Sequence, residues 1–229
     1  MISVKDLTKK FISSSGGLIA VNSISFNVDE GEIVGFLGLN GAGKTTTMRL
    51  LLGYLAPTEG TVMVNSLDPL KNRIALLSQT GYLPENNPLY QEMKVLEYLN
   101  FIQNIKGEGR MSTILEEVGI LDVVNKKIEE LSRGYRQRVG LAAAMIGNPS
   151  VLILDEPTSG LDPLEQEKIR ELIKKISRRK TIIFSTHILS EAEDIATKLI
   201  IINKGSIVYD DKKPKGRGSV EKLFKKLVK

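Results

Sequence analysis

Short runs of apolar residues alternate along the chain with stretches in which apolar residues recur at every third or fourth position. Residues 32–38 (EIVGFLG), 151–154 (VLIL) and 181–185 (TIIFS) have the length and composition of buried strands. Residues 44–52 follow the first of these runs and have helical character. This alternation predicts an α/β fold in which a mainly parallel sheet carries helices on both faces.

Two local signals place a helix and a hairpin in the second half of the chain. Asp162 and Pro163 predict the start of a helix, because an Asp side chain caps free backbone N–H groups and proline fits the first helical position. Apolar residues then recur on one face of that helix at Ile169, Leu172, Ile173 and Ile176. Lys204 and Gly205 separate two strand-like runs, so we expect a two-residue hairpin turn within residues 199–210.

Residues from about 86 to 147 follow a different pattern. Strand signals vanish there, and apolar residues recur with helical spacing at Val95, Tyr98, Leu99, Ile102 and Ile105. The segment Gly107–Gly109 and the residue Gly119 mark breaks between helices. We interpret this stretch as a helical subdomain that is inserted into the α/β core.

The composition agrees with one globular domain of this kind. The chain has 229 residues, of which 41% are hydrophobic and 26% are charged, and it is long enough to bury a sizeable core. No apolar run approaches the roughly 20 residues that cross a bilayer, and the N-terminus lacks the pattern of a signal peptide. The absence of cysteine excludes disulfides and thiolate metal sites. We therefore expect a soluble, cytoplasmic protein.

The charge of the chain is concentrated in its last residues. We divide the single domain into a core (1–85 and 148–210), a helical subdomain (about 86–147) and a basic tail (211–229). Residues 212–229 carry a net charge of +7, so the rest of the chain is close to neutral, because the total is +5. The tail is the candidate for an anionic partner, and we expect no nucleic acid on the body of the domain.

The tail has the pattern of a basic amphipathic helix. Its apolar residues fall on one helical face, at Val220, Leu223, Phe224, Leu227 and Val228. Its lysines fall on the other, at Lys222, Lys225, Lys226 and Lys229. Such a helix can make weak contact with an anionic membrane, or it can pack its apolar face against its own domain. We favour packing, which is the more frequent arrangement.

The stretch GLNGAGKT at residues 38–45 matches G-x-x-x-x-G-K-[ST] after a predicted strand and at the start of a predicted helix. Its glycines let backbone N–H groups turn toward phosphate oxygens, and the helix N-terminus attracts the same anion. Lys44 is expected to reach the β- and γ-phosphates, and the Thr45 hydroxyl to ligate Mg²⁺. The expected nucleotide contacts are Gly38, Leu39, Asn40, Gly41, Ala42, Gly43, Lys44, Thr45 and Thr46. The alternative is an ordinary glycine-rich turn, which would not need the lysine and the threonine.

The stretch VLILDE at residues 151–156 ends a predicted buried strand with two carboxylates. In open α/β sheets, ligands bind beyond the carboxyl ends of the strands, so both side chains are expected beside the phosphates. We assign Asp155 to the metal, through water, and Glu156 to the water that attacks the γ-phosphate. The alternative, two solvated acids at a strand end, is common in isolation but not beside a phosphate-binding loop.

His187 is the only histidine of the chain and follows the predicted strand at residues 181–185. A lone histidine is more often a packing or surface residue than a functional one. Its place at the carboxyl end of a core strand, on the same side as Asp155 and Gly43, favours function. From there it can donate to the γ-phosphate or orient the attacking water.

Four stretches in a fixed order resemble the nucleotide-binding domain of ATP-binding cassette (ABC) transporters over about residues 1–210. They are GLNGAGKT, LSRGY, VLILDEPTSGLD and STH. The phosphate-binding loop alone also occurs in kinases, GTPases and helicases, whereas LSRGY followed by LDEP does not. The segments TGYLPENNPLY and STHILSEAE further resemble ATPases of the ABC-2 exporter group, which includes drug-efflux, polysaccharide-export and gliding-motility ATPases.

The resemblance implies an α/β fold with a P-loop NTPase (RecA-like) core, a small antiparallel β subdomain and the inserted α-helical subdomain. It implies ATP and Mg²⁺ as cofactors and ATP hydrolysis as the activity, with Lys44, Glu156 and His187 as catalytic residues. It also implies that two such domains bind head to tail, as a homodimer or a heterodimer. Ser132 and Gly134 would then contact the γ-phosphate of the partner's ATP, and the D-loop (159–162) would lie at the same interface.

Four positions match the family unevenly. Phe11 matches the aromatic residue that stacks on adenine, although an ordinary buried phenylalanine is the alternative. Glu85 stands where the family has a metal-contacting glutamine, so we expect it beside Mg²⁺, where it adds negative charge. Arg133 and Tyr135 replace the usual Gly and Gln of the signature stretch. Because both expected γ-phosphate contacts of that stretch remain, we expect working sites.

The family also implies a separate transmembrane permease, whose cytoplasmic helices are expected to dock near residues 85–98. The chain would then act as an exporter subunit on the cytoplasmic face of the cell membrane. One rival is a soluble ABC ATPase in DNA repair or translation, but the chain lacks the long coiled coil of the first type and the second cassette of the other. A second rival is a catalytically silent binding partner, which the presence of Lys44, Glu156 and His187 disfavours.

Overall fold

The computed structural model describes residues 1–13, 16–107 and 110–228, and these residues form two sheets. The larger has the strand order β5-β6-β7-β3-β8-β9, and the smaller has the order β2-β1-β4. The larger sheet contains β3 (Ile33–Leu37), β5 (Thr80–Leu83), β6 (Val151–Asp155), β7 (Thr181–Thr186), β8 (Lys198–Asn203) and β9 (Ser206–Lys212). The smaller contains β1 (Ile2–Ser13), β2 (Gly16–Val28) and β4 (Glu59–Val64).

The larger sheet is parallel except for β9, and the smaller is antiparallel throughout. The helices are α1 (Lys44–Leu51), α2 (Arg73–Gln79), α3 (Val95–Lys106), α4 (Met111–Val118), α5 (Arg133–Met145), α6 (Pro163–Ile176), α7 (Leu189–Ile195) and α8 (Ser219–Leu227). Single 3₁₀ turns lie at Leu121–Val123, Ile128–Glu130 and Ser177–Arg179. The predicted α/β class and the small antiparallel sheet are confirmed.

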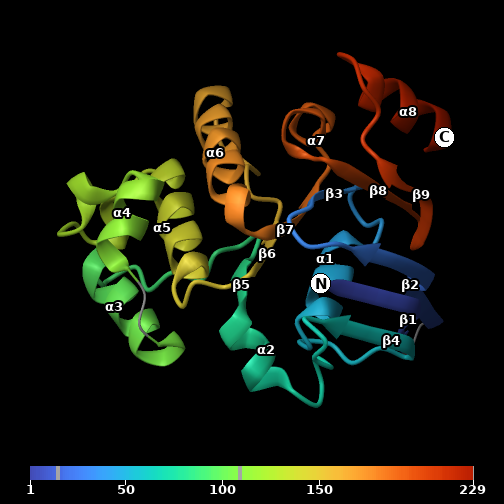
Figure 1. Ribbon diagram of the computed structural model, residues 1–229, viewed down its shortest axis with the longest axis horizontal. Helices are drawn as coiled ribbons and strands as arrows, with labels where there is room; N and C mark the ends of the chain where they lie inside the picture. The colour runs from blue at the N-terminus through green and yellow to red at the C-terminus, as the bar shows by residue number, and fades with distance from the viewer. Residues whose placement is uncertain (14–15, 108–109, 229) are drawn as a thin grey trace.

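Both faces of the larger sheet are buried, which explains why its strands read as continuous apolar runs. In β6, Leu152 and Leu154 face one apolar cluster, and Val151 and Ile153 face the other. The first cluster is covered by α3 to α8. The second is covered by α1 and the smaller sheet, and α1 lies between the two sheets (Figure 1). The predicted helices on both faces are therefore present.

The local signals in the second half of the chain have the expected effects. The Asp162 side chain accepts a hydrogen bond from the backbone N–H of Glu165 at 3.0 Å, and Pro163 is the first residue of α6. Lys204 and Gly205 have φ angles of 48° and 82°, which are the positive values that a two-residue turn of the favoured twist requires. The turn joins β8 to β9 as a hairpin.

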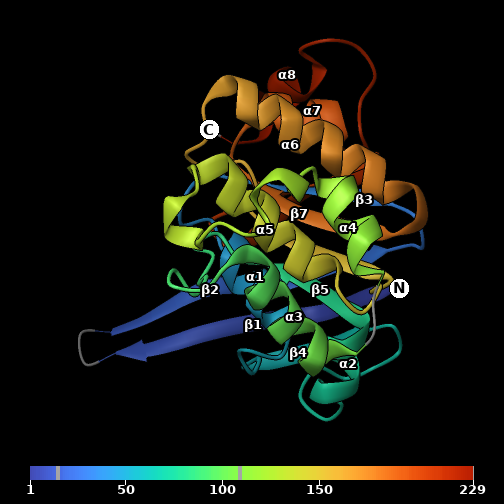
Figure 2. The same cartoon turned by 90° about the vertical axis from the view of Figure 1, so that its left-hand side faces the viewer.

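The chain between β5 and β6 forms helices and 3₁₀ turns, with no strand among its described residues. Figure 2 views the molecule from the side of these helices, α3, α4 and α5. Gly107 ends α3 with φ 95°, and Gly119 ends α4 with φ 66°, as the breaks in periodicity predict. Glu108 and Gly109 of the first predicted break lie outside the described residues. No helix in the described ranges is long and apolar enough to cross a membrane.

The basic tail forms α8, and its apolar face packs against the domain beside α7 (Figure 1). Val220 is 0% exposed and Phe224 is 8% exposed. The Glu193 carboxylate of α7 accepts hydrogen bonds from the backbone N–H groups of Gly218 and Val220, at 3.0 and 3.4 Å. The bond from Gly218 contributes most to lowering the pKa of Glu193. Packing on the domain is therefore confirmed, although Lys229 of the predicted polar face lies outside the described residues.

Truncation of Phe224 tests how much this packing contributes. We expect Phe224→Ala to lower the free energy of unfolding by about 3 kcal/mol, because it leaves a cavity under α8. The exposed Lys222→Ala is the matched control and should change stability by less than about 0.5 kcal/mol. Urea unfolding measures both. Equal stability of the two variants, or a loss of vesicle co-sedimentation in Phe224→Ala, would show that the apolar face serves a membrane instead.

Candidate functional site

The carboxyl ends of three neighbouring strands bring the predicted site residues together. Strands β6, β7 and β3 are adjacent and parallel. Strand β3 leads into the loop at residues 38–43, β6 ends at Asp155, and β7 ends at Thr186, directly before His187. Segments that are distant in the sequence therefore meet at one edge of the sheet.

Two glycines shape the loop between β3 and α1. Gly43 has φ 110°, and a Cβ there would lie 2.4 Å from the carbonyl oxygen of Ala20. A Cβ at Gly38 would lie 2.6 Å from the carbonyl oxygen of Ile202, so neither position has room for a side chain. The backbone N–H groups of residues 43–46 find no acceptor among the described residues. These donors at the start of α1 fit the oxygens of a phosphate group.

Lys44 lies folded into this loop. Its ammonium group donates to the carbonyl oxygens of Gly38 and Leu39, at 2.9 and 3.2 Å, and lies 3.1 Å from Oε1 of Glu156. The side chains of Lys44 and Glu156 are each 6% exposed, so water screens their attraction only weakly. A phosphate that enters the loop therefore replaces groups of the protein as the partner of the lysine.

Glu156 has a backbone conformation that few residues other than glycine adopt. Its φ is 49°, and its N–H donates to the Ser185 hydroxyl at 3.0 Å while its carbonyl oxygen accepts from the N–H of Ser159 at 3.0 Å. The carboxylate oxygen Oε2 lies 2.8 Å from Nδ1 of His187. Both carboxylate oxygens are thus held by groups from neighbouring strand ends. Backbone conformations of this kind concentrate at functional sites.

Asp155 is buried and uses only one of its carboxylate oxygens. Oδ1 accepts hydrogen bonds from Ser185 at 2.5 Å and from Thr45 at 3.2 Å, whereas Oδ2 has no partner among the described residues. Burial raises the pKa of Asp155, the two hydroxyl groups lower it, and the charges of Glu85 and Glu156 raise it. An unpaired carboxylate oxygen beside a threonine hydroxyl fits a hard cation such as Mg²⁺.

The protein alone supplies few ligands for such a cation. Within the described ranges, no group of three or more His, Cys, Asp or Glu residues could hold a metal ion. Mg²⁺ is commonly held by one or two protein groups together with substrate phosphates and water. Glu85 is exposed just beyond β5 and acts on the charge of Asp155 from the same edge. The donor set therefore fits Mg²⁺ that arrives with a nucleotide.

Phe11 lies on the hairpin of β1 and β2. Its side chain is 38% exposed, and the ammonium group of Lys9 lies 5.2 Å from its ring centroid. Phe11 pairs with Leu18, and Ala20 further along β2 lies against Gly43, so the hairpin borders the phosphate-binding loop. The interpretation of Phe11 as an ordinary buried residue is wrong. An exposed ring at this position has a face that a base can stack on.

The signature stretch lies at the start of α5. Ser132 is exposed, and its hydroxyl caps the helix by accepting from the N–H of Tyr135 at 3.3 Å. Gly134 is buried, and a Cβ there would lie 2.5 Å from Oε2 of Glu165. No hydrogen bond or ion pair joins residues 131–138 to residues 38–46 in the part of the chain that the structure describes. The signature residues therefore do not complete the phosphate-binding loop of their own chain.

The two unusual residues of this stretch have partners within the chain. The guanidinium group of Arg133 covers Gly160, where a Cβ would lie 2.3 Å from it. The Tyr135 hydroxyl donates to Asp122 at 2.7 Å, and this bond is the largest cause of the raised pKa of Tyr135. Both side chains are thus accommodated while Ser132 stays exposed.

Two contacting residues were not singled out by the sequence analysis. Ser185 bridges Asp155 and the backbone of Glu156. Gln137 of α5 donates to the carbonyl oxygen of Pro157 at 2.7 Å. A polar residue near the end of the apolar strand TIIFST is a usable signal for Ser185. Gln137 offers no such signal in the sequence, because its partner is a backbone carbonyl group.

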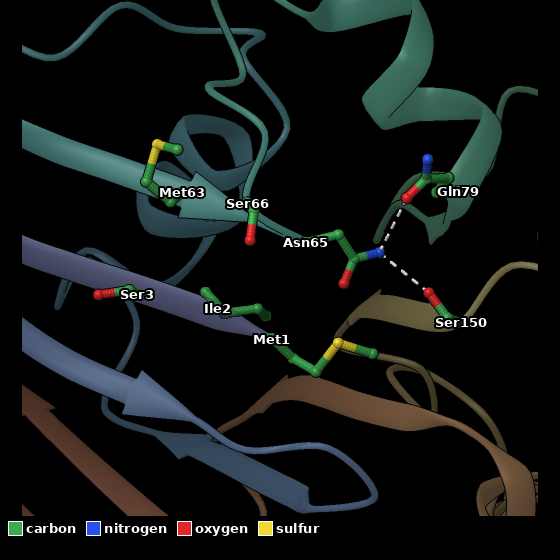
Figure 3. Close-up of a pocket in the computed structure, with 8 residues that line it drawn as sticks. All are labelled: Met1, Ile2, Ser3, Met63, Asn65, Ser66, Gln79 and Ser150. Atoms are coloured by element: carbon green, nitrogen blue, oxygen red, sulfur yellow. Dashed lines mark hydrogen bonds between the residues drawn. The ribbon is translucent and has the colours of Figure 1, made fainter.

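A separate pocket of about 540 Å³ lies near the amino-terminal ends of β5 and β6, away from the carboxylates (Figure 3). It is lined by Met1, Ile2, Ser3, Met63, Asn65, Ser66, Gln79 and Ser150. The Asn65 amide donates to Gln79 and Ser150 across it, at 3.4 and 2.9 Å. None of the predicted site residues lines this pocket, so the phosphate chemistry belongs to the opposite edge of the sheet.

The groups on the three strand ends can bind a nucleoside triphosphate and direct water onto its terminal phosphate, which is the chemistry of a P-loop ATPase. A family profile described as "ABC transporter" matches residues 21–159. The ATP-binding protein NatA of Bacillus subtilis is 32% identical over 98% of this chain and 92% of its own length. BcrA, the bacitracin transport ATP-binding protein of Bacillus licheniformis, is 36% identical over 96% of this chain and 74% of its own length. The chain belongs to the ABC transporter family, as an ATP-binding subunit.

Solved structures share the whole architecture. The dimeric ABC transporter cassette MJ0796 superposes with a TM-score of 0.84 at 27% identity, over 94% of this chain and 100% of that one. A dimeric post-hydrolysis state of MJ0796, bound to ADP and Pi, superposes with a TM-score of 0.84 at 26% identity. Cassettes of this kind dimerise and hydrolyse ATP, so the predicted activity and the predicted dimer are confirmed at the level of the family.

Removal of the hydrogen bond from Ser185 to Asp155 should change how MgATP affinity depends on pH. This bond lowers the pKa of Asp155, so its removal in Ser185→Ala favours the protonated carboxyl, which does not bind Mg²⁺. We expect MgATP affinity to fall more at about pH 6 than at about pH 8, because protonation of Asp155 competes with Mg²⁺. Ser177→Ala, which removes a buried hydroxyl bonded to the Lys174 carbonyl, is the control. Nucleotide titrations that show the same loss at both pH values would contradict this assignment.

Proposed function

We propose that the chain is the motor subunit of an ABC-2 type exporter, in which ATP closes a head-to-tail pair of cassettes and hydrolysis opens it. The observation that supports this most is the buried Glu156 carboxylate, 3.1 Å from the ammonium group of Lys44 and 2.8 Å from the His187 ring. A carboxylate held between two such groups is placed to accept a proton from water. An intact constellation of this kind also disfavours a catalytically silent binding partner.

In this proposal, nucleotide binding prepares the base. The γ-phosphate attracts Lys44 away from Glu156, which leaves Oε1 without its partner. Oε1 then accepts a proton from the attacking water, the water oxygen bonds to the γ-phosphorus, and the bond to ADP breaks. His187 holds Oε2 and keeps the carboxylate in place, and its ring can donate to the γ-phosphate.

The remaining residues bind and orient the nucleotide. Residues 38–46 surround the phosphates, and Phe11 stacks on the base. Thr45 and Asp155, with Glu85 beside them, would hold Mg²⁺, which neutralises charge on the phosphate oxygens. Since Glu85 is a carboxylate, it adds to the negative charge beside Asp155 and favours the divalent ion.

The partner cassette completes the site. Ser132 is exposed and Gly134 lies at a helix start, so both can approach a γ-phosphate that a second cassette presents. Residues 159–162 lie on the same surface, because Arg133 covers Gly160. In a homodimer, a two-fold axis would produce two equivalent shared sites.

The permease is proposed to dock between the core and the helical segment 86–147, which we keep as the division of the domain. Tyr90 is 55% exposed and Phe101 is 41% exposed, and their ring centroids lie 5.9 Å apart. A hollow of about 430 Å³ on the helical segment itself is lined by apolar and polar residues: Met93, Lys94, Leu96, Glu97, Asn100, Phe101, Asn104, Val124 and Asn125. A hollow with apolar and polar side chains suits an amphipathic helix of a separate permease, and in this proposal the chain lies at the cytoplasmic face of the membrane. The similarity to BcrA, a bacitracin transport protein, supports a role in transport.

Glu156→Gln tests the catalytic assignment. It keeps the shape of the side chain and removes the base, so we expect ATP hydrolysis to fall by about 10²- to 10⁴-fold while MgATP still binds. The variant should accumulate as a dimer in excess MgATP, as measured by light scattering after gel filtration. Glu167→Gln, an exposed change on α6, is the control and should behave like the parent. A Glu156→Gln variant that stays monomeric, or that hydrolyses ATP at the parent's rate, would contradict the proposal.

Ser132→Ala tests the sharing of the site between two chains. Because Ser132 reaches only the partner's nucleotide, we expect hydrolysis to fall about tenfold while the ATP affinity of the monomer stays within about twofold. Ser132→Asn retains a helix cap but not the hydroxyl, and it should show the same loss. Thermal unfolding of both variants separates the cap from the contact. Weakened binding by the monomer would place Ser132 in its own chain's site.

A further inference from the structure

A buried carboxyl group behind the site has no part in the chemistry described above. Glu191 of α7 is 1% exposed and forms no ion pair among the described residues. Its Oε1 accepts a hydrogen bond from the Thr158 hydroxyl at 3.1 Å, and its Oε2 accepts one from the Thr186 hydroxyl at 2.5 Å. Both threonines are also buried, at 1% and 0% exposed. Burial of a carboxylate without a cation is unfavourable, so its two hydrogen bonds must compensate.

The two threonines belong to different functional segments. Thr158 precedes residues 159–162, which face the partner in the proposed dimer. Thr186 directly precedes His187, and its oxygen also accepts from the N–H of Ile188 at 2.9 Å. One side chain therefore joins the partner-facing segment to the segment that carries the histidine.

We propose that Glu191 is a positioning residue that couples residues 158–162 to His187. The proposal rests on the proposed function, since it needs His187 to act on Glu156. Movement of Thr158, when a partner contacts residues 159–162, passes through the carboxylate to Thr186. In the single chain the His187 ring already lies 2.8 Å from Oε2 of Glu156, and the link through Glu191 holds it there when a partner contacts residues 159–162.

The coupling depends on the charge of Glu191. An ionised carboxylate accepts from both hydroxyls, whereas a protonated carboxyl must donate through one oxygen. One of the two hydroxyls then accepts instead of donating, and this favours Thr158, because one lone pair of the Thr186 oxygen already accepts from the N–H of Ile188. Both bonds can form in either state, but in the ionised form they are charge-assisted, so the link to residues 159–162 is stronger in the ionised form than in the protonated form.

Glu191 changes charge near neutral pH. Burial raises its pKa to about 7, the hydrogen bonds from Thr186 and Thr158 lower it, the charge of Glu156 raises it, and Arg170 lowers it. Arg170 of α6 is itself 3.4 Å from the carboxylate of Asp194. The remaining elements against α7 present the apolar residues of β3, His187 directly after β7, and Val220 and Phe224 of α8.

Glu191→Gln separates coupling from simple structural support. A glutamine donates through one atom and accepts through the other, so it imitates the protonated acid at every pH. In the full-length chain, we expect kcat at about pH 8 to fall about tenfold while KM changes by less than about twofold. In the parent, we expect ionisation of Glu191 to raise kcat between about pH 6 and pH 8.5. In Glu191→Gln this rise should be absent.

Thr158→Val removes the other end of the link without touching a titratable group. It should cause the same loss of kcat, and the double variant should lose no more than either single variant, because both break one connection. Glu171→Gln, an exposed change on α6, is the control and should retain the parent's profile. Additive losses in the double variant would overturn the coupling.

Thermal unfolding verifies that Glu191 titrates in the folded chain. A carboxyl whose pKa is higher in the folded than in the unfolded state contributes stability at low pH, and this contribution is lost as pH rises through about 7. The parent's Tm should therefore fall relative to that of Glu191→Gln between about pH 5 and pH 8. If the parent hydrolyses ATP and Glu191→Gln follows its pH profile, the coupling alone is overturned. If the parent hydrolyses no ATP, the proposed function fails, and the coupling fails with it.

Discussion

The Glu156 carboxylate connects the three strand ends that form the site. Lys44 reaches it from the loop after β3, and His187 reaches it from the end of β7. Neither contact is possible unless β6, β7 and β3 are neighbours and their pairing register aligns their ends, with Asp155 opposite Ser185 and Leu37 opposite Thr186. A slip of one residue would turn each side chain to the other face of the sheet. The two apolar clusters that close both faces therefore fix the site as well as the fold.

The same arrangement links binding to catalysis. Before nucleotide binds, the positive charge of Lys44 is compensated by two backbone carbonyls and by the base itself. In the proposed mechanism a phosphate replaces these partners, so the carboxylate is released only when its substrate is present. The positive φ of Glu156 adds to this effect, because Ser185 and Ser159 hold the backbone in place while the side chain changes partners. Water activation in the absence of ATP is thereby disfavoured.

The sequence predicts the parts of this structure whose signals are local. The phosphate-binding loop, the strand that ends in Asp155, the cap at Asp162 and the turn at Lys204 each follow from a few adjacent residues. The four-residue strand β5 was not predicted, because it is short and contains Gly81, a residue that is rare in strands. The glycine serves packing against α5, since a Cβ there would lie 2.1 Å from the Ala144 carbonyl oxygen. Glu191 reads as an ordinary charged residue of a helix, and its burial follows only from the packing of α7 on the sheet. What the sequence misses are contacts between segments that are distant along the chain.

The surface offered to the partner is already ordered within one chain. Glu165 of α6 occupies the space beside Gly134, and its carboxylate lies 3.8 Å from Arg138 of α5, so the starts of α5 and α6 are held together. Arg133 lies over Gly160, so a side chain at position 160 would displace its guanidinium group. A surface that is ordered before association loses less conformational entropy when the complex forms. Affinity between two cassettes can then depend mainly on the nucleotide phosphates, which is the condition under which cleavage of one phosphate bond separates them.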